Sequence, residues 1–175
     1  IYIGYRYYET RGFEEGYNGK YVTDGSAAKP NIHGTTTTEW DSWYESNVVY
    51  PFGYGLSYTT FSQEIVEVSK DNNSNITSKD SITVKVKVTN TGSVAGKETA
   101  QLFLTPPYYE GGIEKAHVVY AAYAKTGMLQ PGESEIVEMT VKVEDFKSYD
   151  YSDANGNGFK GYELEAGTYE LKLMS

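Results

Sequence analysis

Strict alternation of apolar and polar residues in the second half of the chain is the feature that most limits its fold. Residues 82–88 run Ile, Thr, Val, Lys, Val, Lys, Val, and residues 137–143 again place an apolar residue at every second position. Successive side chains of an extended strand point to opposite faces, so a period of two predicts strands with one buried and one solvated face. Residues 169–173 show the same pattern near the end of the chain.

Weaker strand candidates and turn signals complete an all-β pattern. The weaker candidates are residues 64–69, 99–105 and 117–125, and clusters of Asn, Asp, Gly and Pro separate the candidates from one another. Six or seven short strands within about 110 residues are typical of a sandwich of immunoglobulin or fibronectin III type. We therefore predict an all-β fold, an immunoglobulin or fibronectin III-like antiparallel β-sandwich preceded by an irregular aromatic-rich segment.

Aromatic residues divide the chain near residue 62. Residues 1–62 hold 15 aromatic residues, and the remaining 113 hold 11. Within the first part we expect a strand over residues 1–8 and a long polar loop over residues 11–47. The chain opens in a strand-like run without an initiator Met, which leads us to expect a piece of a longer polypeptide.

Charge and cysteine content exclude several classes of site and partner. With 24 acidic against 15 basic residues and a net charge of −9, the chain is not expected to bind nucleic acid or to dock on an anionic membrane by charge. No apolar run reaches the roughly 20 residues that cross a bilayer. The absence of cysteine excludes disulfides, thiolate zinc sites and a cysteine nucleophile. A secreted and a cytoplasmic location are both compatible with the sequence, because a sandwich of this size needs no disulfide.

Residues 50–59 carry a resemblance to a known family. Their sequence, Tyr-Pro-Phe-Gly-Tyr-Gly-Leu-Ser-Tyr-Thr, closely resembles the signature that joins the second and third domains of glycoside hydrolase family 3, whose members are β-glucosidase and β-xylosidase type enzymes. Residues 1–10 look like the segment usually found just before it, and the resemblance continues through residues 86–98, 129–134 and 165–171. Motifs in the family's order over most of the chain make the match specific. The structural family motif comprises Tyr50, Pro51, Phe52, Gly53, Tyr54, Gly55, Leu56 and Ser57.

This resemblance implies a domain assignment and a role. Residues 63–175 would be the family's fibronectin type III-like domain, and residues 1–62 the end of its α/β sandwich domain with a long loop and the connector. The partners implied are the remaining α/β sandwich and barrel domains of a parent glycosidase, which hydrolyses β-linked sugars with net retention and without a cofactor. Residues 117–134 look most like members in which the barrel follows this domain. The loop over residues 11–47 is longer than the family's usual joins, so no role is carried over to it.

Residues 1–10 would be separated here from the sheet to which they belong in the parent protein. We expect them to be disordered, to fold back on the sandwich, or to pair with another copy in a strand-mediated self-association.

No catalytic residue is predicted in this chain. Retaining glycoside hydrolysis needs a carboxylate nucleophile and a second carboxyl group about 5–5.5 Å away. The resemblance implies that the nucleophile is an Asp in a Ser/Thr-Asp-aromatic motif of the barrel, and that the acid/base is usually a Glu of the α/β sandwich domain. Asp24 is followed by Gly25 instead of an aromatic residue, and Asp41 has the wrong neighbours. We therefore expect a non-catalytic fragment that buttresses and packs domains together.

Trp40, Trp43 and Tyr44 are weak candidates for sugar binding. An indole ring offers flat apolar area that can stack on a pyranose ring. This possibility underlies the alternative function, an independent carbohydrate-binding or adhesion module with an immunoglobulin-like fold. Packing of the long loop on the sandwich is the favoured interpretation, because large aromatic residues mostly serve packing.

A six-residue motif, Asp-Ala-Asn-Gly-Asn-Gly, resembles the opening of a calcium loop. Asp153, Asn155 and Asn157 supply oxygen atoms at positions one, three and five, and Gly follows at position six. Position twelve is Leu164 where an EF-hand has a bidentate Glu, and Glu163 falls one residue early. A hairpin loop is the favoured interpretation. No metal site is therefore predicted, and the three residues remain weak candidates.

Overall fold

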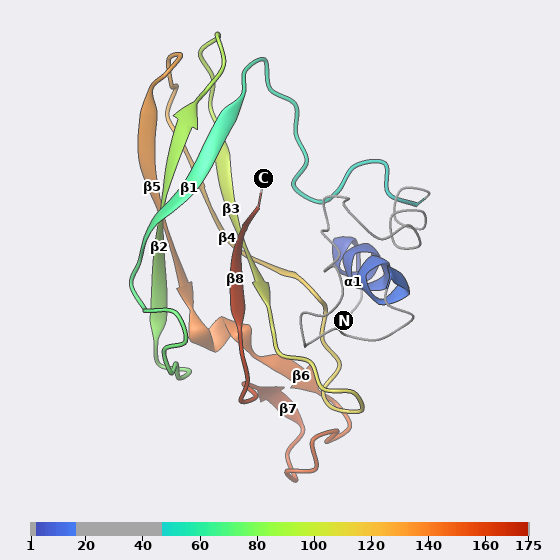
Figure 1. Ribbon diagram of the computed structural model, residues 1–175. Helices are drawn as coiled ribbons and strands as arrows, with labels where there is room; N and C mark the ends of the chain where they lie inside the picture. Colours follow the sequence, from blue (N-terminus) through green and yellow to red (C-terminus); the bar gives the residue numbers. More distant parts are fainter. Residues whose placement is uncertain (1–2, 17–46, 175) are drawn as a thin grey trace.

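The computed structural model describes residues 3–16 and 47–174. Two antiparallel three-stranded sheets pack face to face, and a helix lies beside one of them (Figure 1). The helix and strands are α1 (Tyr5–Gly16), β1 (Phe61–Val68), β2 (Ser81–Asn90), β3 (Thr99–Thr105), β4 (Val119–Lys125), β5 (Ser134–Lys142), β6 (Ser148–Asp150), β7 (Gly161–Glu163) and β8 (Glu170–Met174), with a short 3-10 helix η1 (Val143–Phe146) after β5. None of the helices in this described part is long and apolar enough to span a bilayer.

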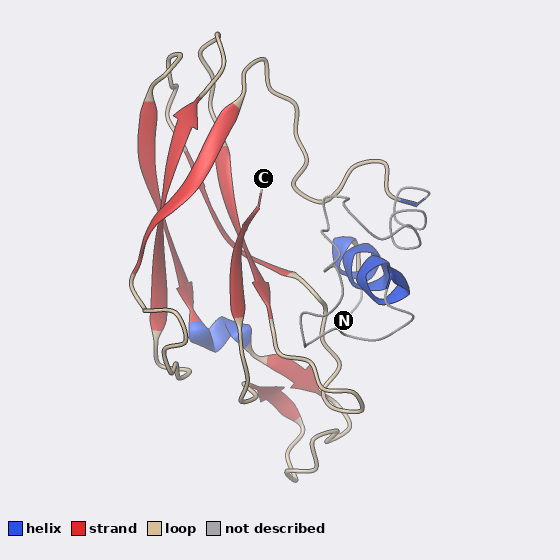
Figure 2. Cartoon of the chain, in the orientation of Figure 1, coloured by secondary structure: helices blue, strands red, loops and turns tan. Residues whose placement is uncertain are grey.

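The sheet topology confirms the predicted β-sandwich. One sheet has the order β1-β2-β5 and the other the order β4-β3-β8, while β6 and β7 form a separate hairpin below them (Figure 2). Every pairing is antiparallel. All six strands of the two sheets fall on segments that the sequence pattern predicts. The loop between β6 and β7 is the hairpin loop expected at residues 153–158. The two strands themselves were not among the predicted strands, because strands of three residues are too short to show a period.

The hydrophobic core lies between the two sheets and follows from the alternation in the sequence. Along β2 the burial alternates with the sequence, so that Val84, Val86 and Val88 point inward and Lys87 remains exposed. Side chains of β5 alternate in the same way. The buried core cluster comprises Ile82, Val84, Val86, Val88, Ala100, Leu102, Leu104, Leu129, Val137, Met139, Val141, Val143 and Phe146.

The strand predicted over residues 1–8 is wrong, because the described part of this segment turns at Gly4 and is helical from Tyr5. Tyr5 and Glu9 are four residues apart and line the same cavity, as neighbours on one face of a helix do. Ile and Tyr are apolar enough for either pattern, so packing of this face against the sandwich decides between helix and strand. The loop predicted over residues 11–47 is likewise wrong at its start, since residues 11–16 belong to α1; residues 17–46 lie outside the described ranges.

Of the three outcomes expected for residues 1–10, folding back on the sandwich is the one that residues 5–10 show. They do so as a helix, and two of its side chains bond to the backbone that enters β4. These residues therefore do not form the strand through which self-association was expected.

Candidate domain-joining site

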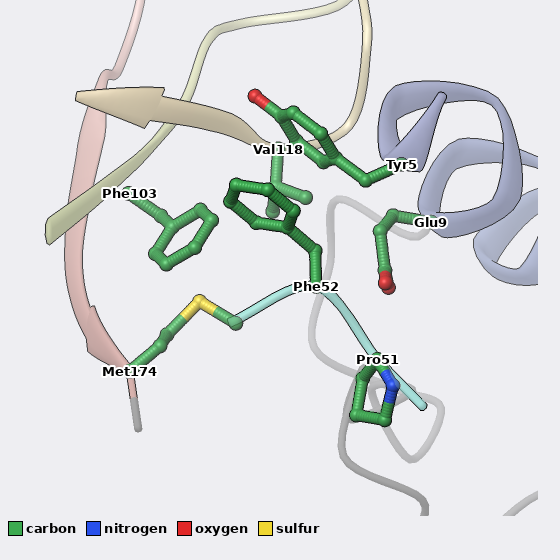
Figure 3. A pocket seen from close by; sticks show the side chains of 7 residues that line it. All are labelled: Tyr5, Glu9, Pro51, Phe52, Phe103, Val118 and Met174. Carbon is green, nitrogen blue, oxygen red and sulfur yellow. The ribbon is translucent and has the colours of Figure 1, made fainter. Parts of the chain in front are cut away.

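Four aromatic rings join α1 and the connector, residues 48–62, to the sandwich, and we call this group the aromatic seam. Phe52 of the connector stacks on Tyr5 of α1, with ring centroids 4.1 Å apart and an interplanar angle of 20°. On its other side Phe52 meets Phe103 of β3 and Tyr120 of β4 edge to face, at 6.0 Å and 5.7 Å. Figure 3 shows the Phe52 ring lying between Tyr5 and Phe103. Offset stacks and edge-to-face pairs are the arrangements that the charge distribution of aromatic rings favours.

Hydrogen bonds anchor the same elements. The backbone N–H of Tyr120 donates to the hydroxyl of Tyr5 at 2.8 Å, and the backbone N–H of His117 donates to Thr10 Oγ1 at 2.9 Å. Burial, together with the nearby Tyr123 and Tyr5 hydroxyls, raises the pKa of Tyr120. The helix therefore satisfies backbone donors at the start of β4 that would otherwise need water.

Gly53 allows the connector to approach the sheet closely. Its carbonyl oxygen accepts a hydrogen bond from Gln101 Nε2 of β3 at 3.2 Å. Its φ of +88° is favoured only by glycine, and a Cβ atom there would lie 2.7 Å from Gln101 Oε1. The glycine that follows Phe52 in the motif thus lets the chain turn while Phe52 remains in the seam.

Five further apolar residues of the connector are largely exposed. Val49, Tyr50, Tyr54, Leu56 and Tyr58, which we call the apolar strip, have exposed fractions from 51% for Tyr54 to 98% for Tyr58. Tyr50 and Tyr54 stack on each other with centroids 4.9 Å apart, and the turn between them closes with a hydrogen bond from Tyr54 N to Pro51 O. The connector therefore places the ring of Phe52 on the sandwich and leaves the apolar strip exposed.

Three of the sequence motifs meet at one corner of the sandwich, around the fully buried Asn90. Its Oδ1 accepts hydrogen bonds from Thr59 Oγ1 at 2.8 Å and from Gly92 N at 3.1 Å. Its Nδ2 donates to the carbonyl oxygens of Val94 and Leu129. Gly92 has no room for a side chain, since a Cβ would lie 2.2 Å from Thr59 Oγ1. This network ties the end of the connector to two turns of the sandwich and fixes where β1 begins.

A fourth motif closes the opposite end. Glu165 forms an ion pair with Lys115, whose side chain is 2% exposed and also donates to the carbonyl oxygen of Pro107. Gly167 packs against Pro107, and a Cβ there would lie 2.6 Å from Pro107 Cβ. These contacts hold the loop after β3 against the turn before β8.

Comparison with known proteins agrees with this geometry. Residues 98–175 match the model of a family described as the fibronectin type III-like domain. Beta-glucosidase A of Butyrivibrio fibrisolvens is 35% identical over 181 residues, which cover 99% of this chain and 18% of that protein. The beta-glucosidase of Ruminococcus albus is 38% identical over 130 residues, 74% of this chain and 13% of that protein.

Solved structures give the same result. A beta-glucosidase from Paenibacillus barengoltzii superposes with a TM-score of 0.71 at 34% identity, over 99% of this chain and 15% of its own. Beta-glucosidase 3B from Thermotoga neapolitana superposes with a TM-score of 0.64 at 32% identity, over 99% of this chain and 17% of its own. The chain is a relative of the family 3 β-glucosidases. It spans less than a fifth of the length of these relatives.

Family 3 chemistry needs two carboxyl groups that face each other across a sugar, and two small cavities in the described residues do not provide such a pair. One, of about 10 Å³, lies in the seam and is lined by a single carboxyl group, that of Glu9. The other, of about 60 Å³, is lined by that of Asp145. Both are far smaller than the roughly 300–1,000 Å³ of typical ligand pockets. Neither cavity brings two carboxyl groups together, and the contacts around the first one are packing contacts between elements.

The candidate residues from the sequence fall in three places. The family motif lies at the seam and the strip, and Asp153, Asn155 and Asn157 lie in the β6–β7 loop. Trp40, Trp43 and Tyr44 lie outside the described residues. Sequence reasoning missed Tyr5 as a seam residue and Thr10 as a residue that bonds to the sandwich. The spacing of four positions between Tyr5 and Glu9 was the signal that could have shown a helix here.

Proposed function

We propose that this chain is a non-catalytic, buttressing part of a retaining family 3 β-glucosidase that acts on β-linked sugars. Residues 63–175 are its fibronectin type III-like domain, and residues 1–62 lead to it from the α/β sandwich domain. The observation that carries the proposal is the division of the connector, in which Phe52, 42% exposed, packs against the rings of the seam while the apolar strip is more exposed.

The apolar strip is the surface that the neighbouring domains of the parent cover. Scattered apolar residues are ordinary on a protein surface, but five large ones within ten consecutive positions form a continuous apolar segment. Residues 47–62 contain no charged side chain, which is the composition of an interface core. Relatives of more than five times this length supply the further domains that such a surface requires.

A graft tests this role. The matching segment of Butyrivibrio fibrisolvens beta-glucosidase A is replaced by this chain, with and without the double substitution Leu56→Ser and Tyr58→Ser. Because both side chains are almost fully exposed in the chain alone, the pair should change its free energy of unfolding by less than about 1 kcal/mol. In the graft it should lower the midpoint of thermal unfolding and the β-glucosidase activity.

Ile136→Ser provides the matched control for the graft. Ile136 is 59% exposed on the outer face of β5, where the proposal places no partner, so the graft should tolerate this change. Equal losses from the strip and the Ile136 variants would refute a docking role for the strip.

Activity of the chain alone tests the other half of the proposal. The 175-residue chain should release no p-nitrophenol from p-nitrophenyl β-glucoside, because both carboxyl groups of the reaction belong to other domains. Turnover that copurifies with the chain and disappears when the chain is heat-denatured would contradict a non-catalytic role.

A further inference from the structure

We infer that Asn157 in the β6–β7 loop is a site of self-modification, at which attack by the backbone nitrogen of Gly158 converts the side-chain amide to a carboxylate. Three asparagines of the chain precede glycine, namely Asn18, Asn155 and Asn157, and the first of them lies outside the described residues. A glycine has no Cβ to obstruct the approach of its backbone nitrogen to the preceding side chain. The loop that holds the other two asparagines extends beyond the ends of both sheets, at the bottom of Figure 1.

A carboxylate holds the backbone N–H group that would attack. Asp153 Oδ1 accepts a hydrogen bond from Gly158 N at 3.0 Å. A general base must lie within hydrogen-bond distance of the proton that it removes, and this carboxylate does. The other asparagine lacks such a base, since Gly156 N donates at 3.1 Å to the backbone carbonyl oxygen of Asp153, which is a far weaker base than a carboxylate.

The side-chain carbonyl group of Asn157 is polarised for attack. Its Oδ1 accepts a hydrogen bond from Phe159 N at 2.8 Å. A donor aimed at a carbonyl oxygen stabilises the negative charge that develops there during attack, as in an oxyanion hole. The corresponding hydrogen bond at Asn155, donated by Asn157 N to Asn155 Oδ1, is longer at 3.2 Å.

The amide nitrogen of Asn157 is held as well. Its Nδ2 donates to Glu163 Oε2, an oxygen that also accepts from Asn155 Nδ2 at 3.2 Å. With both ends of the amide bonded, the group stays in one orientation beside the nitrogen that attacks it, which lowers the entropic part of the barrier. Asn157 and Gly158 are also exposed, so water reaches the reacting group.

The reaction is an intramolecular substitution followed by hydrolysis, and it needs only water. Asp153 takes the proton of Gly158 N, this nitrogen forms a bond to Cγ of Asn157, and the bond between Cγ and Nδ2 breaks. The amide nitrogen leaves as ammonia, with the proton that Asp153 then releases. Water opens the cyclic succinimide at either of its carbonyl groups, which gives aspartate or isoaspartate.

The product changes the contact with Glu163. An amide donates a hydrogen bond to this carboxylate, whereas a second carboxylate has no donor and repels it. The strands β6 and β7 are only three residues long, so this contact is a substantial part of what closes their loop. The modification therefore weakens the hairpin, and it is irreversible because the ammonia is lost.

Peptide mapping of the 175-residue chain after incubation in neutral buffer tests the site. Trypsin cleavage after Lys147 and Lys160 releases residues 148–160 as one peptide that contains both asparagines, so tandem mass spectrometry measures both rates on the same molecules. In the folded chain we expect Asn157 to be converted at least about tenfold faster than Asn155. In the chain unfolded by urea the loop contacts are absent, and the two rates should become similar.

Asp153→Asn removes the base and keeps a side-chain acceptor for Gly158 N. It should slow the conversion of Asn157 in the folded chain at least about tenfold. The control is Asp145→Asn, the same change at an exposed position of η1, and it should leave that rate unchanged. Circular dichroism shows whether the Asp153 variant is folded.

The comparison of the folded and the unfolded chain needs no variant, so it decides the question even if the Asp153 variant does not fold. Equal rates at Asn155 and Asn157 in the folded chain would overturn the proposal. So would a folded chain that converts Asn157 no faster than the unfolded chain does, or a folded Asp153 variant that converts it at the rate of the unaltered chain.

Discussion

Each of the two three-stranded sheets has an outer face, yet only one of the two faces is covered. On the β1-β2-β5 sheet the outward side chains are mostly polar, with Ile136 as an exposed exception, and polar ones pair across strands, as Thr83 with Thr140 and Lys85 with Glu67. On the β4-β3-β8 sheet the outward side chains include Phe103, which is 2% exposed because Phe52 and Tyr120 pack on it. The same sandwich therefore has one solvated outer face and one that serves as an interface.

This difference shows which face of the sandwich has the joining function that we propose. A solvated face needs only alternation along each strand, whereas the covered face needs partners from residues far away in sequence. Phe103 and Phe52 are such a pair, and Tyr120 bonds to Tyr5 over 115 positions. The joining function that we propose thus depends on the covered face and its outermost layer, the apolar strip.

The largest effect is expected from truncating the covered face. Phe103→Ala should lower the free energy of unfolding by about 3–5 kcal/mol, because it removes a buried ring and leaves a cavity in the seam. Thr140→Ala, at an exposed position on the other sheet, should change it by no more than about 0.5 kcal/mol. Urea denaturation of both variants measures the difference. Similar losses from the two variants would show that the faces do not differ in the way described.

A pH titration distinguishes the two sides next. Burial, and secondarily the charge of Lys172, lowers the pKa of His117 from 6.5 to about 3 beside α1. The unfolded chain then binds a proton that the folded chain does not. The stability contributed by neutral His117 is complete above pH 6.5 and is lost as the pH falls toward 3. Between these values the unfolding constant should rise by up to about tenfold per pH unit.

His117→Gln isolates this contribution. Its free energy of unfolding should depend less steeply on pH between 6.5 and 3 than that of the unaltered chain. Chemical denaturation at a series of pH values gives both curves, and parallel curves would place His117 in contact with solvent in the folded state.

The smallest effect is expected on the solvated side. Hydrogen bonds from Lys70 and Thr77 lower the pKa of Asp80, at the turn before β2, from 3.8 to about 2. This stabilisation is therefore present above pH 4 and is lost as the pH falls from about 4 to 2, a lower and narrower window than that of His117. Asp80→Asn should be less stable than the unaltered chain at pH 7, with a difference that shrinks in this window. A difference that stays constant down to pH 2 would exclude ionised Asp80 as its cause.

Much of the fold could be predicted from the sequence, because it follows from local patterns. The spacing of Val84, Val86 and Val88 is enough to predict β2 and its buried face. The motif residues were also recognisable in the sequence. Which of them packs on the sandwich and which remains exposed was not. Nothing in the order Tyr50, Pro51, Phe52 distinguishes the ring that enters the seam from the ring that remains exposed, since both are aromatic and two positions apart.

The β6–β7 hairpin shows the same limit. The spacing of Asp153, Asn155 and Asn157 was visible in the sequence. The role of Glu163 was not, since only the pairing of β6 with β7 brings its carboxylate to the amides of Asn155 and Asn157, which donate to it.

The sequence by itself determined the sandwich and its buried inner face, because alternation and turn residues act over a few neighbouring positions. It also determined the resemblance to a known family, because the motifs are short continuous segments. Only the tertiary structure decided that residues 5–16 form a helix, that Phe52 fills the seam and that Glu163 faces the loop. Each of these depends on contacts between residues that are distant in the chain. The free energy of such contacts outweighs weak local preferences, and no short segment of the sequence predicts it.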